Sequence, residues 1–236
     1  MSTYPAATLE RARQVVASLR IFAALPAEAS QALAKLMIPH EYAAGQVICL
    51  EGDPGDYVYV LEKGWIKVVR AAVDGREQIA MLLHDGELFG VEAAFGGAAY
   101  PVTVIALEEV TAWSIERGAL LSLVNRCPAL ALACLKHLSE QVLYYLQLVE
   151  DLGLRSVQAR IAHTLMNHAE LRNGQLVVSR RAWATQDEMA SRLGTVRDVI
   201  NRSLKALEVD GILQIERNQI IILDAQKLVE RGRAAK

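Results

Sequence analysis

The sequence contains little cysteine and no long uninterrupted apolar run. Its three cysteines, Cys49, Cys127 and Cys134, are an odd number without CxxC spacing, which favours a reducing compartment over a disulfide framework. Apolar stretches of about 18 residues without charges are absent, so we expect no membrane span. Residues 1–19 lack the basic and apolar regions of a signal peptide. These absences predict a cytoplasmic protein.

The usual signatures of enzymes are also missing. There is no nucleophile elbow, no Gly-rich phosphate loop followed by Lys, and no pair of candidate catalytic carboxylates. Only His40 and His84 fall in the β-rich part of the chain, at no ligand-like spacing, while Cys134 and His137 are better explained by core packing. We predict no catalytic residues and no metal site. The alternative left open is a metal- or haem-binding β-barrel protein, or an enzyme, fused to a helical module.

Charge is distributed unevenly along the chain. The 236 residues have a net charge of −2, but residues 153–236 hold 14 Lys and Arg against 9 Asp and Glu. The preceding 152 residues hold 11 against 18. The C-terminal third is therefore the part suited to a polyanion.

Residues 42–113 form short apolar runs broken by turns. Gly52-Asp53-Pro54-Gly55-Asp56 and Asp85-Gly86 separate such runs, and Asp74-Gly75 is typical of a hairpin. This spacing indicates an all-β barrel or roll. Residues 9–36, before it, predict short helices.

Residues 128–152 predict one long helix that Gly153 ends. Apolar residues recur along it at alternating spacings of three and four, as in a coiled coil. This seam consists of Leu135, Leu138, Val142, Tyr145, Val149 and Leu152. Leu143, Leu146 and Leu148 supply a second apolar surface, and a helix that is apolar on two sides needs two partners. We therefore expect self-pairing in a homodimer, with packing on its own domain as the alternative.

Residues 185–211 have the local chemistry of a helix-turn-helix. Thr185 and Glu188 are placed for a capping box, Gly194 permits a left-handed turn, and Thr195 is expected to cap the second helix. The predicted buried stripe of that helix is Val199 or Ile200, Leu204 and Leu207. A helix at 156–171, a polar turn and a strand at 176–179 precede the motif, and two apolar runs at 212–215 and 220–223 predict a hairpin, or wing, after it.

The polar face of the second helix carries the candidate base-reading residues. They are Arg197, Asp198, Asn201 and Arg202. In a major groove Arg pairs with guanine, Asp accepts from cytosine and Asn pairs with adenine. The alternative is a solvated face with an Asp198–Arg202 ion pair, but such motifs meet bases with the N-terminal half of this helix. The candidate phosphate contacts are Thr185, Thr195, Arg217 and Asn218.

The order of these segments resembles the Crp/Fnr family of bacterial transcription regulators over nearly the whole chain. The similar residues of the C-terminal part are Gln186-Asp187-Glu188-Met189-Ala190, the spacing of Gly194, Arg197, Asp198 and Arg202, and Leu207-Glu208 before Asp210-Gly211-Ile212-Leu213. Those of the β-region are Gly45-Gln46-Val47-Ile48, Glu51-Gly52-Asp53, Val60-Leu61-Glu62-Lys63-Gly64 and Gly86-Glu87-Leu88-Phe89-Gly90.

The resemblance implies an α+β protein with three parts. A sensor domain at 1–127 has a cyclic-nucleotide-binding-like β-roll and N-terminal helices, 128–152 is a dimerisation helix, and 153–236 is a winged helix-turn-helix. It further implies a homodimer that binds double-stranded DNA at a palindromic operator, with RNA polymerase as another partner. Arg197, Asp198 and Arg202 are expected to read bases.

The resemblance also defines a candidate effector pocket. Its residues are Gly86, Glu87, Phe89, Gly90, Val91, Glu92, Tyr100, Pro101 and Thr103. Members that bind cyclic AMP have Glu just after Phe-Gly, and Arg-Ser further on for the phosphate. Here Val91 follows Gly90, and Tyr100-Pro101 replaces Arg-Ser. A buried phosphate needs a charge-assisted partner, so these residues argue against a cyclic nucleotide.

Other effectors follow from the same resemblance. Iron–sulfur members have an N-terminal cysteine cluster, but no cysteine precedes Cys49 here and three thiolates cannot hold a four-thiolate cluster. Residues 100–103 are similar to those of some nitric-oxide-responsive members, so haem stays open, with His40 and His84 as candidate axial ligands. Redox chemistry at Cys49 or Cys127, and action without any effector, also stay open.

Overall fold

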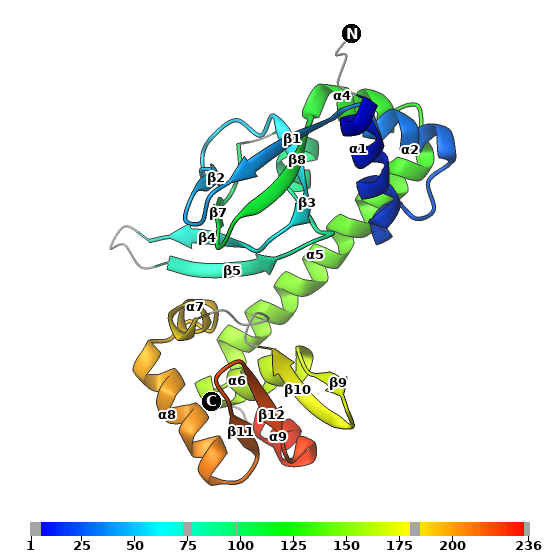
Figure 1. Ribbon diagram of the computed structural model, residues 1–236. Coiled ribbons are helices and arrows are strands. Elements are labelled where there is room, and N and C mark those ends of the chain that lie inside the picture. Colours follow the sequence, from blue (N-terminus) through cyan, green and yellow to red (C-terminus); the bar gives the residue numbers. More distant parts are fainter. Residues whose placement is uncertain (1–5, 73–76, 98, 180–184, 234–236) are drawn as a thin grey trace. The chain divides into compact units, whose positions relative to one another are not determined.

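Two four-stranded sheets form the β-roll of the N-terminal part (Figure 1). The computed structural model describes residues 6–72, 77–97, 99–179 and 185–233. The sheets have the orders β1-β8-β3-β6 and β2-β7-β4-β5. Their strands are β1 (Met37–Tyr42), β2 (Val47–Cys49), β3 (Tyr57–Lys63), β4 (Ile66–Ala71), β5 (Glu77–Leu83), β6 (Leu88–Phe89), β7 (Thr103–Ala106) and β8 (Val110–Glu116). The predicted roll is confirmed; the Asp74-Gly75 turn lies outside the described residues.

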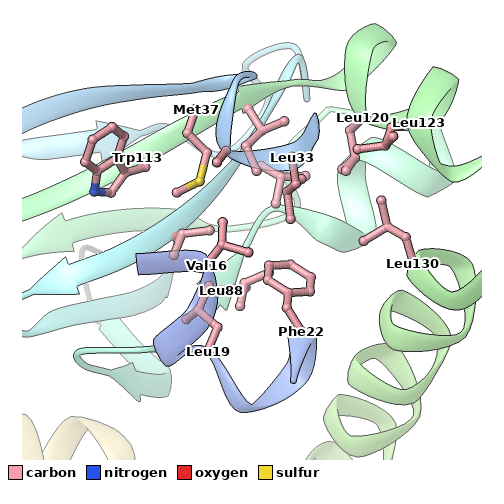
Figure 2. Close-up of a cluster of buried hydrophobic side chains, with 14 of the residues drawn as sticks. Val16, Leu19, Phe22, Leu33, Met37, Leu88, Trp113, Leu120, Leu123 and Leu130 are labelled. Atoms are coloured by element: carbon pink, nitrogen blue, oxygen red, sulfur yellow. The ribbon is translucent and has the colours of Figure 1, made fainter. Parts of the chain in front are cut away.

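Helices cover one end of the roll and share a core with it. They are α1 (Ala6–Ser18), the 3-10 helix η1 (Arg20–Phe22), α2 (Ala27–Ala34), α3 (Val91–Gly96), α4 (Arg117–Val124) and the first part of α5 (Pro128–Leu154). Figure 2 shows this core, which includes Val16, Leu19, Phe22, Leu33, Met37, Leu88, Trp113, Leu120, Leu123 and Leu130. Apolar burial thus joins the helices predicted at 9–36 to the roll.

A charged group on β3 ties α1 to this core. Glu62 Oε2 accepts a hydrogen bond of 2.6 Å from Nε1 of the fully buried Trp113, and its other oxygen lies 2.7 Å from Arg11 Nε. The Arg11 guanidinium carbon is also 5.7 Å from the centroid of the Trp113 ring. A buried indole N–H needs an acceptor, and one carboxylate satisfies it while holding the α1 cation.

The chain separates into two compact units, Met1–Arg70 with Ala80–Leu143 and Ala71–Ile79 with Tyr144–Lys236. The second unit contains a sheet of order β11-β12-β10-β9. Its elements are α6 (Val157–Asn167), β9 (Glu170–Arg172), β10 (Gln175–Ser179), α7 (Gln186–Arg192), α8 (Arg197–Val209), β11 (Leu213–Ile215), β12 (Gln219–Ile222) and α9 (Ala225–Gly232). The helical pair and the hairpin are therefore confirmed.

Two predicted helix ends in this region were wrong. The helix predicted at 156–171 ends at Asn167, because residues 170–172 pair with β10 across a turn in which Asn173 and Gly174 both have positive φ. The long helix continues through Gly153 to Leu154 instead of ending at 152. An interior glycine costs a helix only about 1 kcal/mol, which tertiary packing easily offsets.

The last turn of α5 is fixed to α6 and α9 by charges. Asp151 has one carboxylate oxygen 2.8 Å from Arg155 Nε and the other 3.0 Å from His163 Nδ1 on α6. The Arg155 guanidinium also donates to the carbonyl of Gly232, where α9 ends. These contacts set the direction in which the chain leaves α5.

Gly90 joins β6 to α3 in a conformation that favours glycine. Its φ is +82°, and a Cβ there would lie 2.8 Å from the carbonyl oxygen of Tyr57 and 3.2 Å from Tyr100 Cε1. The glycine is therefore required both by the backbone and by the close approach of Tyr100.

We expect Gly90→Ala to lower the free energy of unfolding by roughly 2–5 kcal/mol, because left-handed strain and a steric clash add. Gly86→Ala is the matched control: its φ is +85°, but nothing lies within 4 Å of the added Cβ. The control should lose only about 1–2 kcal/mol. Urea unfolding of both variants measures the difference, and equal losses would contradict the clash.

Candidate nucleic-acid interface and effector pocket

The first helix of the helix-turn-helix, α7, begins with the predicted capping box. Thr185 Oγ1 accepts a hydrogen bond of 3.3 Å from the Glu188 amide, and Glu188 Oε2 accepts one of 2.6 Å from the Thr185 amide. Gly194, after the helix, has φ +61° as predicted. Two orphan amides are thus satisfied at the start of α7, and its direction relative to α8 is set by the glycine.

A buried arginine that the sequence analysis missed supports this turn. Arg160 of α6 is 6% exposed and donates to the Leu193 carbonyl. A Cβ on Gly194 would lie 3.1 Å from Leu152 Cδ2 and 3.3 Å from Arg160 Nη1. Leu152, placed in the dimer seam by sequence, therefore packs near the turn. The sequence pattern does not distinguish Arg160 from a solvated arginine, because a single arginine in an amphipathic helix is usually on its exposed face.

The second helix, α8, buries one stripe and exposes the face opposite. Its buried residues are Ile200, Leu204 and Leu207, so Ile200 rather than Val199 belongs to the stripe. Arg197, Asp198 and Arg202 are exposed, and Asn201 is half-buried. The residues expected to read bases are thus presented together on the surface.

The contacts that the structure shows for the two arginines of this face are weak and local. Arg197 Nη1 lies 3.4 Å from Asp187 Oδ2 on α7, and both side chains are more than half exposed. Arg202 Nε donates over 3.4 Å to the backbone carbonyl of Asp198 rather than to its carboxylate. Exposed pairs of this length contribute about 0–1 kcal/mol, so DNA phosphates or bases can replace them at little cost.

The predicted cap of α8 was wrong by one residue. Val196, not Thr195, is the N-cap, and it makes no side-chain capping bond. The Thr195 amide instead donates 3.0 Å to the Ala190 carbonyl, which makes Thr195 part of the turn that closes α7.

The wing is a tight hairpin joined to the end of α8. The Glu216 amide donates 2.9 Å to the Gln219 carbonyl, leaving Arg217 and Asn218 exposed at the tip. Glu208 Oε1, near the C-terminus of α8, accepts 3.0 Å from the Ile215 amide. This bond fixes the wing to the recognition helix.

Three aromatic side chains, Tyr59, Phe89 and Tyr100, belong to the buried core of the β-roll. Tyr100 is 4% exposed, and its hydroxyl donates 2.7 Å to the Tyr57 carbonyl and accepts 3.2 Å from the Tyr57 amide. Burial raises the pKa of Tyr100 to about 12, so it remains a neutral phenol. Tyr59 and Phe89 stack with their ring centroids 4.7 Å apart. The roll thus contains its own packed aromatic core where the family resemblance places a ligand.

Glu92 brings one carboxyl group close to this core. Burial raises the pKa of Glu92. The pKa of the nearby Cys49 thiol is raised to about 12, mainly by burial and further by the negative charge of Glu92. One Glu92 oxygen is buried without a hydrogen-bond partner in the described structure. Burial favours the neutral form of this carboxyl group, and neither of its forms supplies the positive charge that a buried phosphate needs.

The remaining pocket candidates lie elsewhere. Val91 packs into the helix-covered core of Figure 2 rather than the aromatic core. Pro101 is exposed, and Thr103 Oγ1 accepts 3.0 Å from the Glu51 amide. Glu87 accepts 2.7 Å from the His84 amide in the turn that contains Gly86. The structure therefore brings together only Phe89, Gly90, Glu92 and Tyr100 of the predicted set.

The candidate metal and redox residues each have local contacts. His40 Nε2 lies 2.9 Å from the buried Ser114 hydroxyl, and His84 contacts the ring of Trp65. No three His, Cys, Asp or Glu side chains converge on a metal position within the described residues. All three cysteines are buried thiols, and burial raises the pKa of Cys134 to about 11.

Among the described helices, none alone is long and apolar enough to cross a bilayer. The pair α4 and α5, bent by 117° at the break between them, meets the criteria of length and composition together.

Comparison with known proteins agrees with both halves of this arrangement. Residues 39–127 match the cyclic nucleotide-binding domain, and residues 159–231 match the Crp-like helix-turn-helix domain. The chain is 28% identical over 224 residues to a CRP-like cAMP-activated global transcriptional regulator of Mycobacterium tuberculosis, covering 93% of this chain and 99% of that protein. It is 27% identical to the cyclic AMP receptor protein of Thermus thermophilus, over 80% of this chain and 85% of that protein.

Solved structures show the same fold. FixK2 from Bradyrhizobium japonicum has a TM-score of 0.72 at 20% identity and covers 85% of this chain and 99% of its own. A CooA mutant from Carboxydothermus hydrogenoformans has a TM-score of 0.73 at 19% identity, over 84% and 88% of the two chains.

The fold and the exposed face of α8 define a sensor-type β-roll combined with a DNA-binding helix-turn-helix. The chain belongs to the Crp/Fnr family and is a DNA-binding transcription regulator of that type.

Proposed function

We propose that this regulator binds a palindromic operator as a cytoplasmic homodimer, contacts RNA polymerase there and has no catalytic activity. Its activity is modulated by an effector at the β-roll or is constitutive. The observation that carries the proposal is the cluster of Arg197, Asp198 and Arg202, exposed on the N-terminal half of a recognition helix whose opposite face is buried. Arg217 and Asn218 at the tip of the wing, with Thr185 and Thr195, are the proposed phosphate contacts.

The apolar surface of α5 supports the homodimer. One side of this helix is buried in its own core through Leu130 and Cys134, and Leu138 packs partly against the same core. On the rest of the helix the side chains of Leu135, Val142 and Val149 are each more than half exposed. A contiguous exposed apolar surface of this kind favours association, and a C2 dimer buries the same patch on both copies.

Replacing an exposed seam residue by a charge should weaken the dimer. Val142→Glu places a carboxylate in each copy of the proposed interface, and we expect the dimer dissociation constant to rise at least about 100-fold. Sedimentation equilibrium over a concentration range measures it. Glu140→Gln, at a polar position of the same helix, should leave the constant unchanged. A Val142→Glu dimer of normal stability would place the interface elsewhere.

The DNA-reading role is tested by selecting bound sequences from a random pool. We expect a palindrome with half-sites about one helical turn apart. Arg202→Ala should weaken binding to it by roughly 1–3 kcal/mol and relax the preference at one position in each half-site. Arg217→Ala is the matched comparison: it should weaken all sequences about equally and lower the salt dependence. Normal binding and selectivity by Arg202→Ala would refute the assignment of the reading helix.

We further propose that the β-roll does not take a cyclic nucleotide, although two relatives carry cyclic AMP in their names. Tyr100 occupies the interior with its hydroxyl satisfied by Tyr57, and Glu92 adds a carboxyl group beside it. Among the described residues the only buried arginine or lysine is Arg160, in the other unit. A desolvated cyclic phosphate would therefore find no buried arginine or lysine among the described residues of the roll.

Titration calorimetry with cyclic AMP and cyclic GMP tests this. We expect no heat of binding up to about 1 mM nucleotide. A dissociation constant above that concentration corresponds to a binding free energy weaker than about −4 kcal/mol. Operator affinity should also be the same with and without either nucleotide. Saturable binding at micromolar concentration would show that the roll rearranges to admit the phosphate.

A further inference from the structure

Val196 is an exposed apolar side chain at the entrance to the recognition helix. It is 64% exposed and is the N-cap residue of α8, immediately before Arg197. Its backbone is extended, with φ −114° and ψ 154°, and its carbonyl accepts the first hydrogen bonds of the helix from the amides of Val199 and Ile200. The valine therefore has a defined backbone position and a largely exposed side chain.

Valine is a poor choice for this position by local criteria. Ser, Thr, Asp or Asn at an N-cap accepts a bond from the helix amides, and an apolar residue forgoes about 0.5–2 kcal/mol. The cap of α7 shows that this chain does use such bonds, through Thr185 and Glu188. A residue that violates a local rule while its side chain stays 64% exposed, so that little burial offsets the loss, is a candidate for function.

The position of Val196 matches one feature of the major groove. The only apolar group on the base edges there is the C5-methyl group of thymine. The N-terminal end of the recognition helix is the end that approaches bases, and Val196 precedes the proposed guanine-reading Arg197 by one residue. A β-branched side chain also has few rotamers to lose on contact.

We propose that Val196 contacts the methyl group of a thymine in each operator half-site, next to the base pair that Arg197 reads, and so discriminates thymine from cytosine. This inference rests on the proposed function of α8. It adds an apolar, methyl-dependent specificity to the polar readout by Arg197, Asp198 and Arg202.

The experiment replaces thymines by deoxyuridine, which removes only the C5-methyl group. The wild-type protein first selects its site from the random pool, and each thymine of that site is then substituted in turn on both half-sites. We expect binding to weaken about three- to fivefold for each half-site, and therefore roughly 10- to 20-fold when both members of one symmetric pair of positions are substituted, the loss given by burial of one methyl group per half-site. Fluorescence anisotropy with labelled duplexes measures the affinities.

Val196→Ser provides the test of the residue. Serine removes both methyl groups and supplies an N-cap, so the helix should fold at least as well. We expect this variant to bind the thymine and deoxyuridine sites equally. Val209→Ser is the matched control, because Val209 is 78% exposed at the other end of the same helix. This control should keep the wild-type preference for thymine.

The outcomes separate the two levels of the proposal. A wild-type protein that selects no sequence overturns the proposed function, and this inference with it. A protein that selects a palindrome but shows no deoxyuridine-sensitive position, or a Val196→Ser protein that retains the sensitivity, overturns only the role of Val196.

Discussion

The proposed DNA-reading surface depends on the burial of one stripe of α8. This stripe packs against α6, α7 and the wing sheet through Ile200, Leu204 and Leu207. Because the opposite face of the helix is not buried, it stays exposed to solvent. The charged residues at Arg197 and Arg202 are therefore directed outward. Arg160 also stabilises the orientation of α8, because its buried guanidinium donates a hydrogen bond to the Leu193 carbonyl at the turn between α7 and α8.

Removing the Arg160 guanidinium from water costs free energy, and the nearby Asp151 carboxylate partly offsets that cost. Burial lowers the pKa of Arg160, while the nearby Asp151 carboxylate raises it. Asp151 also contacts Arg155, just before α6, and His163 within α6, so one carboxylate near the end of α5 interacts with all three basic side chains. The end of the long helix and the orientation of the reading helix thus share one set of charges.

The β-roll matches the cyclic nucleotide-binding domain, and its own side chains pack inside it. The Tyr100 hydroxyl is hydrogen-bonded to the backbone of Tyr57, and Tyr59 stacks on Phe89. Three free thiols lie in the cores, and the raised pKa values of Cys49 and Cys134 keep them protonated. All three side chains are packed in the hydrophobic cores.

The sequence by itself determined the features that depend on local chemistry. The capping box at Thr185, the left-handed Gly194 and the alternation of short strands with glycine turns were all predictable, because each is a property of neighbouring residues. Only the tertiary structure decided that Val196 rather than Thr195 begins α8, and that α5 continues through Gly153. It also revealed the contact of Arg160 with the turn. Of the predicted pocket residues, it placed Val91 in the helix-covered core, Pro101 on the surface and Thr103 against the Glu51 amide. The cap of α8 was missed because the Thr195 amide closes the preceding turn on Ala190, and the buried Arg160 because it contacts Leu193, a residue distant in the chain. Local periodicity encodes neither contact.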